Sequence, residues 1–137
     1  MATVRVLLVE DDKDLQSMYM TIFTDAGYTV ALVDRPIVVS GEASWEEAVA
    51  QALARESTDL VLLDWHLAPS GDGVKIARWL KQHTDRFVRL PPVILMTNDS
   101  PASTFVTTLI NEGVITALFH KVSMGIDDVL AIIRQHL

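Results

Sequence analysis

Short runs of aliphatic residues alternate along this chain with longer stretches in which apolar residues recur every three or four positions. The clearest run is Leu60–Leu63, where four aliphatic residues stand together without a polar side chain. Such a run is typical of a strand that is buried on both faces, as in a parallel sheet. Similar runs of Val, Leu and Ile predict four further strands, over residues 4–9, 28–33, 92–96 and 114–119.

The stretches between these runs have the periodicity of amphipathic helices. In the first stretch one face is apolar, and it consists of Leu15, Met18, Tyr19, Ile22, Phe23 and Ala26. Asp12 is placed to cap the start of this helix, and Gly27 to follow its end in the left-handed conformation. The pattern therefore predicts a helix that begins after Asp12 and ends before Gly27.

Start signals predict the next helices. Ser44 and Glu47 have the spacing of a capping box, which places the second helix directly after Ser44. A third helix begins near Val74, where the apolar periodicity resumes. Ser100 and Pro101 are suited to the N-cap and the first position of a fourth helix, because proline lacks the N–H that this position leaves unpaired.

Two segments leave alternatives open. The last helix can begin at Ser123 or at Asp127, since both residue types favour the first turn of a helix. The segment Asp34–Ala43 contains Pro36, three aliphatic residues and then Ser-Gly. It could lengthen the second strand, form a small extra strand, or be an ordered loop.

Five strands that each precede a helix predict an α/β fold of the (βα)5 type. Because crossovers between parallel strands are right-handed, the helices are expected on both faces of a doubly wound, five-stranded parallel sheet. The flavodoxin-like strand order 2-1-3-4-5 is the arrangement that we expect. In such a sheet, ligands bind in the crevice beyond the carboxyl ends of the strands.

Composition narrows the class of protein. A chain of 137 residues, half of them apolar, fits one domain, 1–137, with a substantial core. The net charge of -7 argues against direct binding of nucleic acid. No apolar run is long enough for membrane insertion and no signal peptide is recognisable, so we expect a cytoplasmic protein. Because the chain ends in a helical pattern, no appended effector domain is expected.

Polar residues stand at the ends of four predicted strands. Glu10 and Asp11 follow the first strand, Asp64 the third, Thr97 the fourth and Lys121 the fifth. Each residue has an ordinary explanation as a turn or cap residue. In the predicted strand order, however, these four strands are neighbours, so their ends open onto one crevice. Coincidence at all four ends is much less probable than a shared site.

These residues form a chemically consistent set. Three crowded carboxylates repel one another and favour a bound cation, and an all-oxygen set suits Mg²⁺. A carboxylate such as Asp64 can attack phosphorus to form an aspartyl phosphate. Lys121 and Thr97 could then bind the phosphoryl oxygens and stabilise the charge that develops during transfer.

The order and spacing of these motifs resemble a known family. The segments Leu8–Asp12, Asp59–Asp64 and Pro92–Thr97, followed by Lys121, are similar to the receiver domain of two-component response regulators. The resemblance covers nearly the whole chain. Within the family, the chain resembles the single-domain, chemotaxis-regulator-like members.

The resemblance implies a role for each residue. Asp64 is the expected phosphoacceptor, Thr97 the switch hydroxyl and Lys121 the phosphate-binding lysine. The expected Mg²⁺ ligands all offer oxygen, and they are Glu10, Asp11, Asp64 and the backbone carbonyl of His66. By the same resemblance the domain catalyses its own phosphorylation and dephosphorylation, although it is primarily a signalling protein.

The resemblance also implies partners. A sensor histidine kinase or a phosphotransfer protein would supply the phosphoryl group. A downstream protein target would bind the face formed by the fourth and fifth strand–helix units. We expect a monomer or a weak dimer.

Several positions depart from the family pattern. The loop after the phosphoacceptor is one residue longer than usual, with the insertion near Ala68. Asn98 follows the switch threonine in place of a small residue. Leu118 stands where an aromatic residue is usual, with Phe119 on the other face of its strand. Val122 replaces the usual proline, so a cis bond there is not expected.

Three other interpretations compete. Asn98, Leu118 and Val122 motivate a receiver-like interaction module that does not switch by phosphorylation. The complete acidic set and Lys121 weigh against this module. A Mg²⁺-dependent phosphohydrolase would normally have a second carboxylate where this chain has His66. A zinc site could use His66 and His120, but two histidines near three carboxylates are a weak zinc signal. Trp65, next to the phosphoacceptor, is expected to lie over the site.

Overall fold

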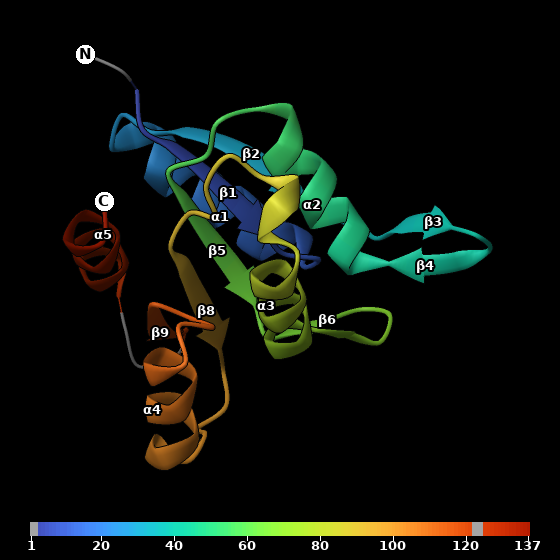
Figure 1. The fold of residues 1–137 in the computed structure, drawn as a ribbon. Helices are drawn as coiled ribbons and strands as arrows, with labels where there is room; N and C mark the ends of the chain where they lie inside the picture. Colours follow the sequence, from blue (N-terminus) through green and yellow to red (C-terminus); the bar gives the residue numbers. More distant parts are fainter. Residues whose placement is uncertain (1–2, 122–124) are drawn as a thin grey trace.

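The computed structural model describes residues 3–121 and 125–137, and its centre is a five-stranded parallel sheet (Figure 1). The strands of this sheet are β1 (Arg5–Val9), β2 (Thr29–Val33), β5 (Leu60–Asp64), β8 (Val93–Thr97) and β9 (Ala117–His120). Their order is β2-β1-β5-β8-β9, and every neighbouring pair is parallel. The predicted order 2-1-3-4-5 is therefore confirmed.

Helices cover both faces of the sheet, as right-handed crossovers require. They are α1 (Lys13–Asp25), α2 (Trp45–Arg55), α3 (Gly73–Gln82), α4 (Ser103–Asn111) and α5 (Ile126–Gln135), with a 3-10 helix, η1 (Thr84–Arg86), after α3. No helix within residues 3–121 and 125–137 has the length and apolar character needed to cross a membrane.

Alternate residues of each central strand face opposite layers of the core. In β1, Leu7 packs with residues of α2 and α3, whereas Leu8 packs with residues of α1 and α5. Phe23 of α1 and Leu80 of α3 are fully buried in these two layers. Both layers hold the central strands in place and so fix the positions of their carboxyl ends.

The first helix begins and ends as predicted, but one face residue differs. The Asp12 carboxylate accepts from the N–H groups of Asp14 and Leu15, and Gly27 has a φ of 90°. Met18, predicted on the apolar face, is 43% exposed, whereas Gln16 is 8% exposed. Gln16 turns inward because its amide donates to a backbone carbonyl at the end of β1.

The segment before α2 is a β-hairpin that the sequence left undecided. Strands β3 (Ile37–Val39) and β4 (Glu42–Ser44) pair antiparallel and project from the body beside α2 (Figure 1). The turn residues Ser40 and Gly41 both have positive φ, as a two-residue hairpin turn requires. Of the three alternatives, a small extra strand is nearest, although two strands form.

The capping box predicted for α2 is only half formed. The N–H of Glu47 donates to the Ser44 hydroxyl at 3.0 Å, as expected for the N-cap. The Glu47 carboxylate instead accepts two hydrogen bonds from Arg86, at 2.8 and 3.1 Å. This bidentate pair ties α2 to η1, and it is a stronger interaction than the return bond of a capping box.

The start of α4 differs from the prediction. The helix begins at Ser103 with Ala102 as its N-cap, not after Ser100. The hydroxyl of Thr97 accepts a hydrogen bond from the N–H of Asp99, which holds the chain in a turn just before the expected cap. The cap signal of Ser100 is therefore overridden by a contact with the end of β8.

The last helix begins between the two predicted positions. It starts at Ile126 after Gly125, whose N–H donates to the Asp128 carboxylate at 2.8 Å. Asp127 is therefore the second residue of the helix and not its cap. Ser123 and Val122 lie outside the described residues, so the predictions made for them remain predictions.

Candidate functional site

Three carboxylates gather at the carboxyl ends of β1 and β5. Val9 and Leu63 are partners in the parallel register, so the next residues, Glu10 and Asp64, extend side by side. One carboxylate oxygen from each of Glu10, Asp11 and Asp64 lies within 4.8 Å of the other two. We call these three residues the acidic cluster. Glu10 and Asp64 are buried and Asp11 is half-buried.

Lys121 reaches this cluster from the end of β9. Its Nζ lies 3.0 Å from Oε2 of Glu10 and 3.1 Å from Oδ1 of Asp64. Its backbone N–H donates to the carbonyl of Thr97 at 2.8 Å, which fixes the residue against the end of β8. The predicted meeting of these strand-end side chains is therefore observed. The ammonium group thus contacts two of the three carboxylates of the acidic cluster.

Because these groups are buried close together, their pKa values differ from the ordinary ones. Burial, reinforced by the negative charge of Asp64, raises the pKa of Glu10 to about 7, despite the opposing effect of Lys121. Burial of Lys121 acts to lower its pKa, but the charges of Asp64 and Glu10 outweigh this effect and raise it. Lys121 therefore stays protonated at neutral pH, while Glu10 titrates near it.

Thr97 ends β8 and is fully buried. Its Oγ1 accepts from the N–H of Asp99 at 3.0 Å. Because a hydroxyl group both accepts and donates, this bond leaves the Thr97 proton able to bind an anionic oxygen. Thr97 and Asp64 thus end neighbouring strands, β8 and β5, as the sequence predicted.

The chain around Asp64 is held tightly. The N–H of Trp65 donates to the carbonyl of Met96 at 2.8 Å, and the N–H of Gly73 donates to the carbonyl of Trp65 at 2.6 Å. A Cβ at Gly73 would lie 2.5 Å from the carbonyl oxygen of Asp64. Only glycine fits this approach of α3 to the end of β5.

The longer loop after Asp64 forms a second small hairpin. Strands β6 (His66–Leu67) and β7 (Gly71–Asp72) pair antiparallel, and the residue near the predicted insertion, Ala68, lies between them. The N–H of Ala68 donates to Oδ2 of Asp11 at 3.1 Å. The lengthened loop therefore contributes a hydrogen bond to the acidic cluster, which the sequence did not predict.

His66 occupies the rim of the site. Its ring is exposed, and Nε2 lies 2.7 Å from Oδ2 of Asp99. Within the described residues, the cluster of possible metal-ligating side chains contains neither His66 nor His120. The arrangement therefore does not support the zinc interpretation. The metal role predicted for His66 concerns its backbone carbonyl and remains a prediction.

Aromatic side chains line the entrance. The ring of Trp65 stacks on Phe105 of α4, with centroids 5.9 Å apart, and on His66 at the same distance. The sequence placed Trp65 near the site but did not identify Phe105. Asn98, the residue after Thr97, is exposed.

Leu118 and Phe119 lie on opposite faces of β9, as predicted. Leu118 is half-buried against the core layer of α2 and α3, whereas Phe119 is buried in the layer of α1 and α5. The position usual for an aromatic switch residue therefore carries an aliphatic side chain within the described sheet.

Comparison with known families identifies the chain. A family model described as the response regulator receiver domain matches residues 6–126. The chain belongs to this family. The family assignment made from the strand-end motifs is thus confirmed, and the domain is of the kind found in two-component systems.

One curated relative is a transcriptional regulatory protein, GltR of Pseudomonas aeruginosa. It is 30% identical over 95 residues, which are 69% of this chain and 34% of GltR. The chain thus spans about a third of the length of this relative.

Solved receiver domains share the fold. The receiver domain of a LuxO repressor protein from Vibrio parahaemolyticus has a TM-score of 0.76 at 23% identity, covering 98% of this chain and 90% of that one. CheY4 of Vibrio cholerae has a TM-score of 0.74 at 17% identity, covering 99% and 100%. The receiver domain of the sensor kinase PA1611 from Pseudomonas aeruginosa, solved with magnesium in its active-site cleft, has a TM-score of 0.73 at 20% identity, covering 98% of both chains.

Receiver domains bind Mg²⁺ in an acidic pocket, and this chain has an acidic cluster at the carboxyl ends of β1 and β5. The family interacts with histidine kinases and downstream targets. These are properties of the family, and the function proposed below for this chain starts from them.

Proposed function

We propose that this protein is a signalling switch that accepts a phosphoryl group on Asp64. The observation that carries the proposal is the position of the Asp64 carboxylate, buried beside two acidic residues and 3.1 Å from the Lys121 ammonium. An isolated structural aspartate does not need such neighbours. A carboxylate that must carry a doubly charged phosphoryl group does.

The donor set fits magnesium. Three carboxylates against one ammonium leave an excess of negative charge, and oxygen ligands suit this hard cation. Glu10, Asp11, Asp64 and the carbonyl of His66 are the residues that would hold it. When bound, Mg²⁺ supplies positive charge that neutralises the carboxylates and polarises phosphoryl oxygens.

The side chains of the chain supply the remaining chemistry. An oxygen of Asp64 attacks phosphorus of a phosphohistidine, so that a P–O bond forms as the P–N bond breaks and the imidazole leaves. Lys121, now paired with Glu10 and Asp64, donates to a phosphoryl oxygen. The hydroxyl of Thr97 donates to another. Charge that develops in the transfer is thereby met by fixed donors.

The partners follow from this chemistry. The donor is a sensor histidine kinase or a phosphotransfer protein, and the receiver of the signal is a downstream protein that binds the face of α4, β9 and α5. Phosphorylation adds negative charge at Asp64 and draws Thr97 and Lys121 toward it. We place this activity in the cytoplasm and expect a monomer or a weak dimer.

A second function, an interaction module that does not switch, is favoured by one observation. Leu118 is packed half-buried on the core, and no aromatic ring stands at that position to turn inward. Under this alternative the acidic cluster still binds Mg²⁺, but phosphorylation leaves the target-binding face unchanged.

Intact mass after incubation with Mg²⁺ and phosphoramidate tests the proposal. The wild type is expected to gain one phosphoryl group, and the gain is expected to vanish with EDTA and in Asp64→Asn. Asp85→Asn, an exposed aspartate on η1, is the matched control and should be phosphorylated normally. If the protein gains no phosphoryl group from phosphoramidate or from a histidine kinase, the switch proposal is wrong.

A further inference from the structure

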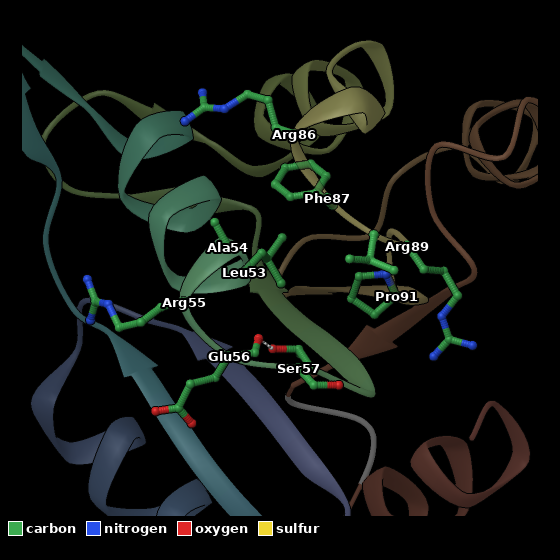
Figure 2. A pocket seen from close by; sticks show the side chains of 11 residues that line it. Leu53, Ala54, Arg55, Glu56, Ser57, Arg86, Phe87, Arg89 and Pro91 are labelled. Atoms are coloured by element: carbon green, nitrogen blue, oxygen red, sulfur yellow. Dashed lines mark hydrogen bonds between the residues drawn. The ribbon is translucent and has the colours of Figure 1, made fainter.

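A hollow of about 510 Å³ lies at the end of the sheet opposite the acidic cluster (Figure 2). It opens between the end of α2 and the segment that follows η1. Thr58, which lines it, precedes β5, whereas Asp64 ends that strand. Pro91 likewise precedes β8, which ends at Thr97. We call the surface formed by residues 53–58 and 86–91 the amino-end groove.

The floor of the amino-end groove is apolar. Leu53 and Phe87 are half-buried against the core, and Pro91 is buried. Figure 2 shows these side chains in the middle of the groove, between the end of α2 and the segment after η1. Val88, also in the lining, has its side chain fully in solvent. A partner that covered this floor would remove apolar surface from water.

The rim of the groove is basic. Four of the seven arginines of the chain pair with acidic side chains, namely Arg5 with Glu56, Arg35 with Asp34, Arg78 with Glu112 and Arg86 with Glu47. Arg55 and Arg89 have no ion pair with any residue in 3–121 or 125–137, and both line the groove. In a chain of net charge -7, two such arginines at one hollow leave local positive charge uncompensated.

The groove is extended. Arg89 also lines two adjoining hollows of about 270 and 330 Å³, the first running toward Val114 and the second toward Val4. A compact ligand would fill one of these hollows. An elongated ligand can follow all three along the amino ends of the strands.

We propose that the amino-end groove binds an acidic peptide segment of a partner protein. An apolar side chain of the peptide covers Leu53 and Phe87. Carboxylates of the peptide on either side of that residue pair with Arg55 and Arg89. Guanidinium groups suit this role because they bind carboxylates in a bidentate manner. The site is separate from the phosphoryl chemistry at Asp64 and does not depend on it.

The probe is a fluorescein-labelled six-residue peptide with a central Leu-Phe pair and two glutamates on each side. Its matched control has glutamines in place of the glutamates. Fluorescence polarisation with the full chain is expected to show saturable binding of the glutamate peptide, at least about tenfold tighter than that of the glutamine peptide. Binding is expected to weaken as salt rises, because the charges at the rim are exposed.

Charge-reversal variants locate the site. Arg55→Glu combined with Arg89→Glu should weaken binding by at least about tenfold, since attraction at two positions becomes repulsion. Lys75→Glu combined with Arg134→Glu is the control, because both residues are exposed, line none of the three hollows and together change the net charge by the same amount as the double variant. Circular dichroism checks that all variants are folded.

Amide chemical shifts add a direct map. Perturbations by the glutamate peptide are expected at residues 53–58 and 86–91 of the wild type. No saturable binding, equal binding of the two peptides, or a normal affinity in the double variant would overturn the proposal. Concentration-dependent self-association in sedimentation that is lost in Arg89→Glu would overturn it too, because a second copy of the chain would then be the occupant.

Discussion

The Nζ of Lys121 lies 3.1 Å from Oδ1 of Asp64 and 3.0 Å from Oε2 of Glu10, so a bound cation would compete with this ammonium for the same two carboxylates. The side chain of Lys121 is only 7% exposed, so the pair is shielded from solvent. Lys121 therefore offsets part of the negative charge of the acidic cluster when the cation is absent, and it is positioned to bind the phosphoryl group when one is added.

Replacement of this lysine should separate the two effects. Lys121→Met leaves the buried carboxylates without a counter-charge, so we expect the free energy of unfolding in EDTA to fall by about 3 kcal/mol. The same change removes a competing cation, so Mg²⁺ should bind more tightly. Denaturant titration and calorimetry measure the two quantities. Lys75→Met, on the exposed face of α3, is the control, and equal Mg²⁺ affinities in all three proteins would contradict this account.

The raised pKa of Glu10 should make Mg²⁺ binding depend on pH near neutrality. The pKa of Glu10 is raised to about 7, so its carboxylate is progressively protonated below that pH and ceases to be a metal ligand. The apparent Mg²⁺ affinity is expected to fall up to about tenfold per pH unit below 7. Calorimetry between pH 5.5 and 8 at constant ionic strength, about 0.15 M, tests this. An equally steep dependence in Glu10→Gln would assign the effect elsewhere.

The same titration has a consequence for stability without metal. A carboxyl group whose pKa is higher in the folded state favours folding when protonated. Its contribution is fully present below the ordinary value of 4.5 and is lost as the pH rises through about 7. In EDTA, the part of the unfolding free energy that Glu10→Gln abolishes should therefore decrease across this range. An increase would contradict the assigned pKa.

Gly73 should be intolerant of any side chain. A Cβ there would meet the carbonyl oxygen of Asp64 at 2.5 Å and the Cα of Trp65 at 2.9 Å. We expect Gly73→Ala to lower the unfolding free energy by about 1–3 kcal/mol and to weaken Mg²⁺ binding, because the backbone of Asp64 must move. Gly125→Ala is the comparison, since its Cβ would be 3.9 Å from its nearest neighbour. Similar effects of the two changes would refute this role of Gly73.

Trp65 should report events at the site. It follows Asp64 directly and stacks on Phe105 of α4 at 5.9 Å. Addition of Mg²⁺ or of phosphoramidate is expected to change its emission, and Trp65→Phe should abolish that change. Trp79→Phe, which alters a helix residue stacked on His83, should retain it. Loss of the signal in Trp79→Phe alone would mean that another tryptophan senses the site.

Sequence patterns predicted the sheet and the meeting of its strand-end side chains because both follow from parallel topology. Once Val9 and Leu63 are neighbours in register, the positions of Glu10 and Asp64 are determined. The predictions were weakest where loops make the contacts. The bond from Ala68 to Asp11 and the pair of His66 with Asp99 depend on loop shapes that no periodicity encodes.

The β3–β4 hairpin and the start of α4 show the same limit of prediction from sequence. Three aliphatic residues at Ile37–Val39 are compatible with a strand, but their partner strand, Glu42–Ser44, has no apolar pattern of its own. Pairing there depends on the positive φ values of Ser40 and Gly41. At α4, Ser100 is a residue type that favours the N-cap, but the helix begins at Ser103 because the turn that Thr97 stabilises holds the chain before it.

The central claim is that Asp64 itself carries the phosphoryl group, and reduction of the phosphorylated protein with borohydride tests it most directly. An aspartyl phosphate is reduced to homoserine, which peptide mass spectrometry locates by position. We predict homoserine at position 64 in the wild type after treatment with Mg²⁺ and phosphoramidate, and none when EDTA is present. Homoserine at position 11 instead, or a phosphorylated protein in which residue 64 remains aspartate, would contradict the account.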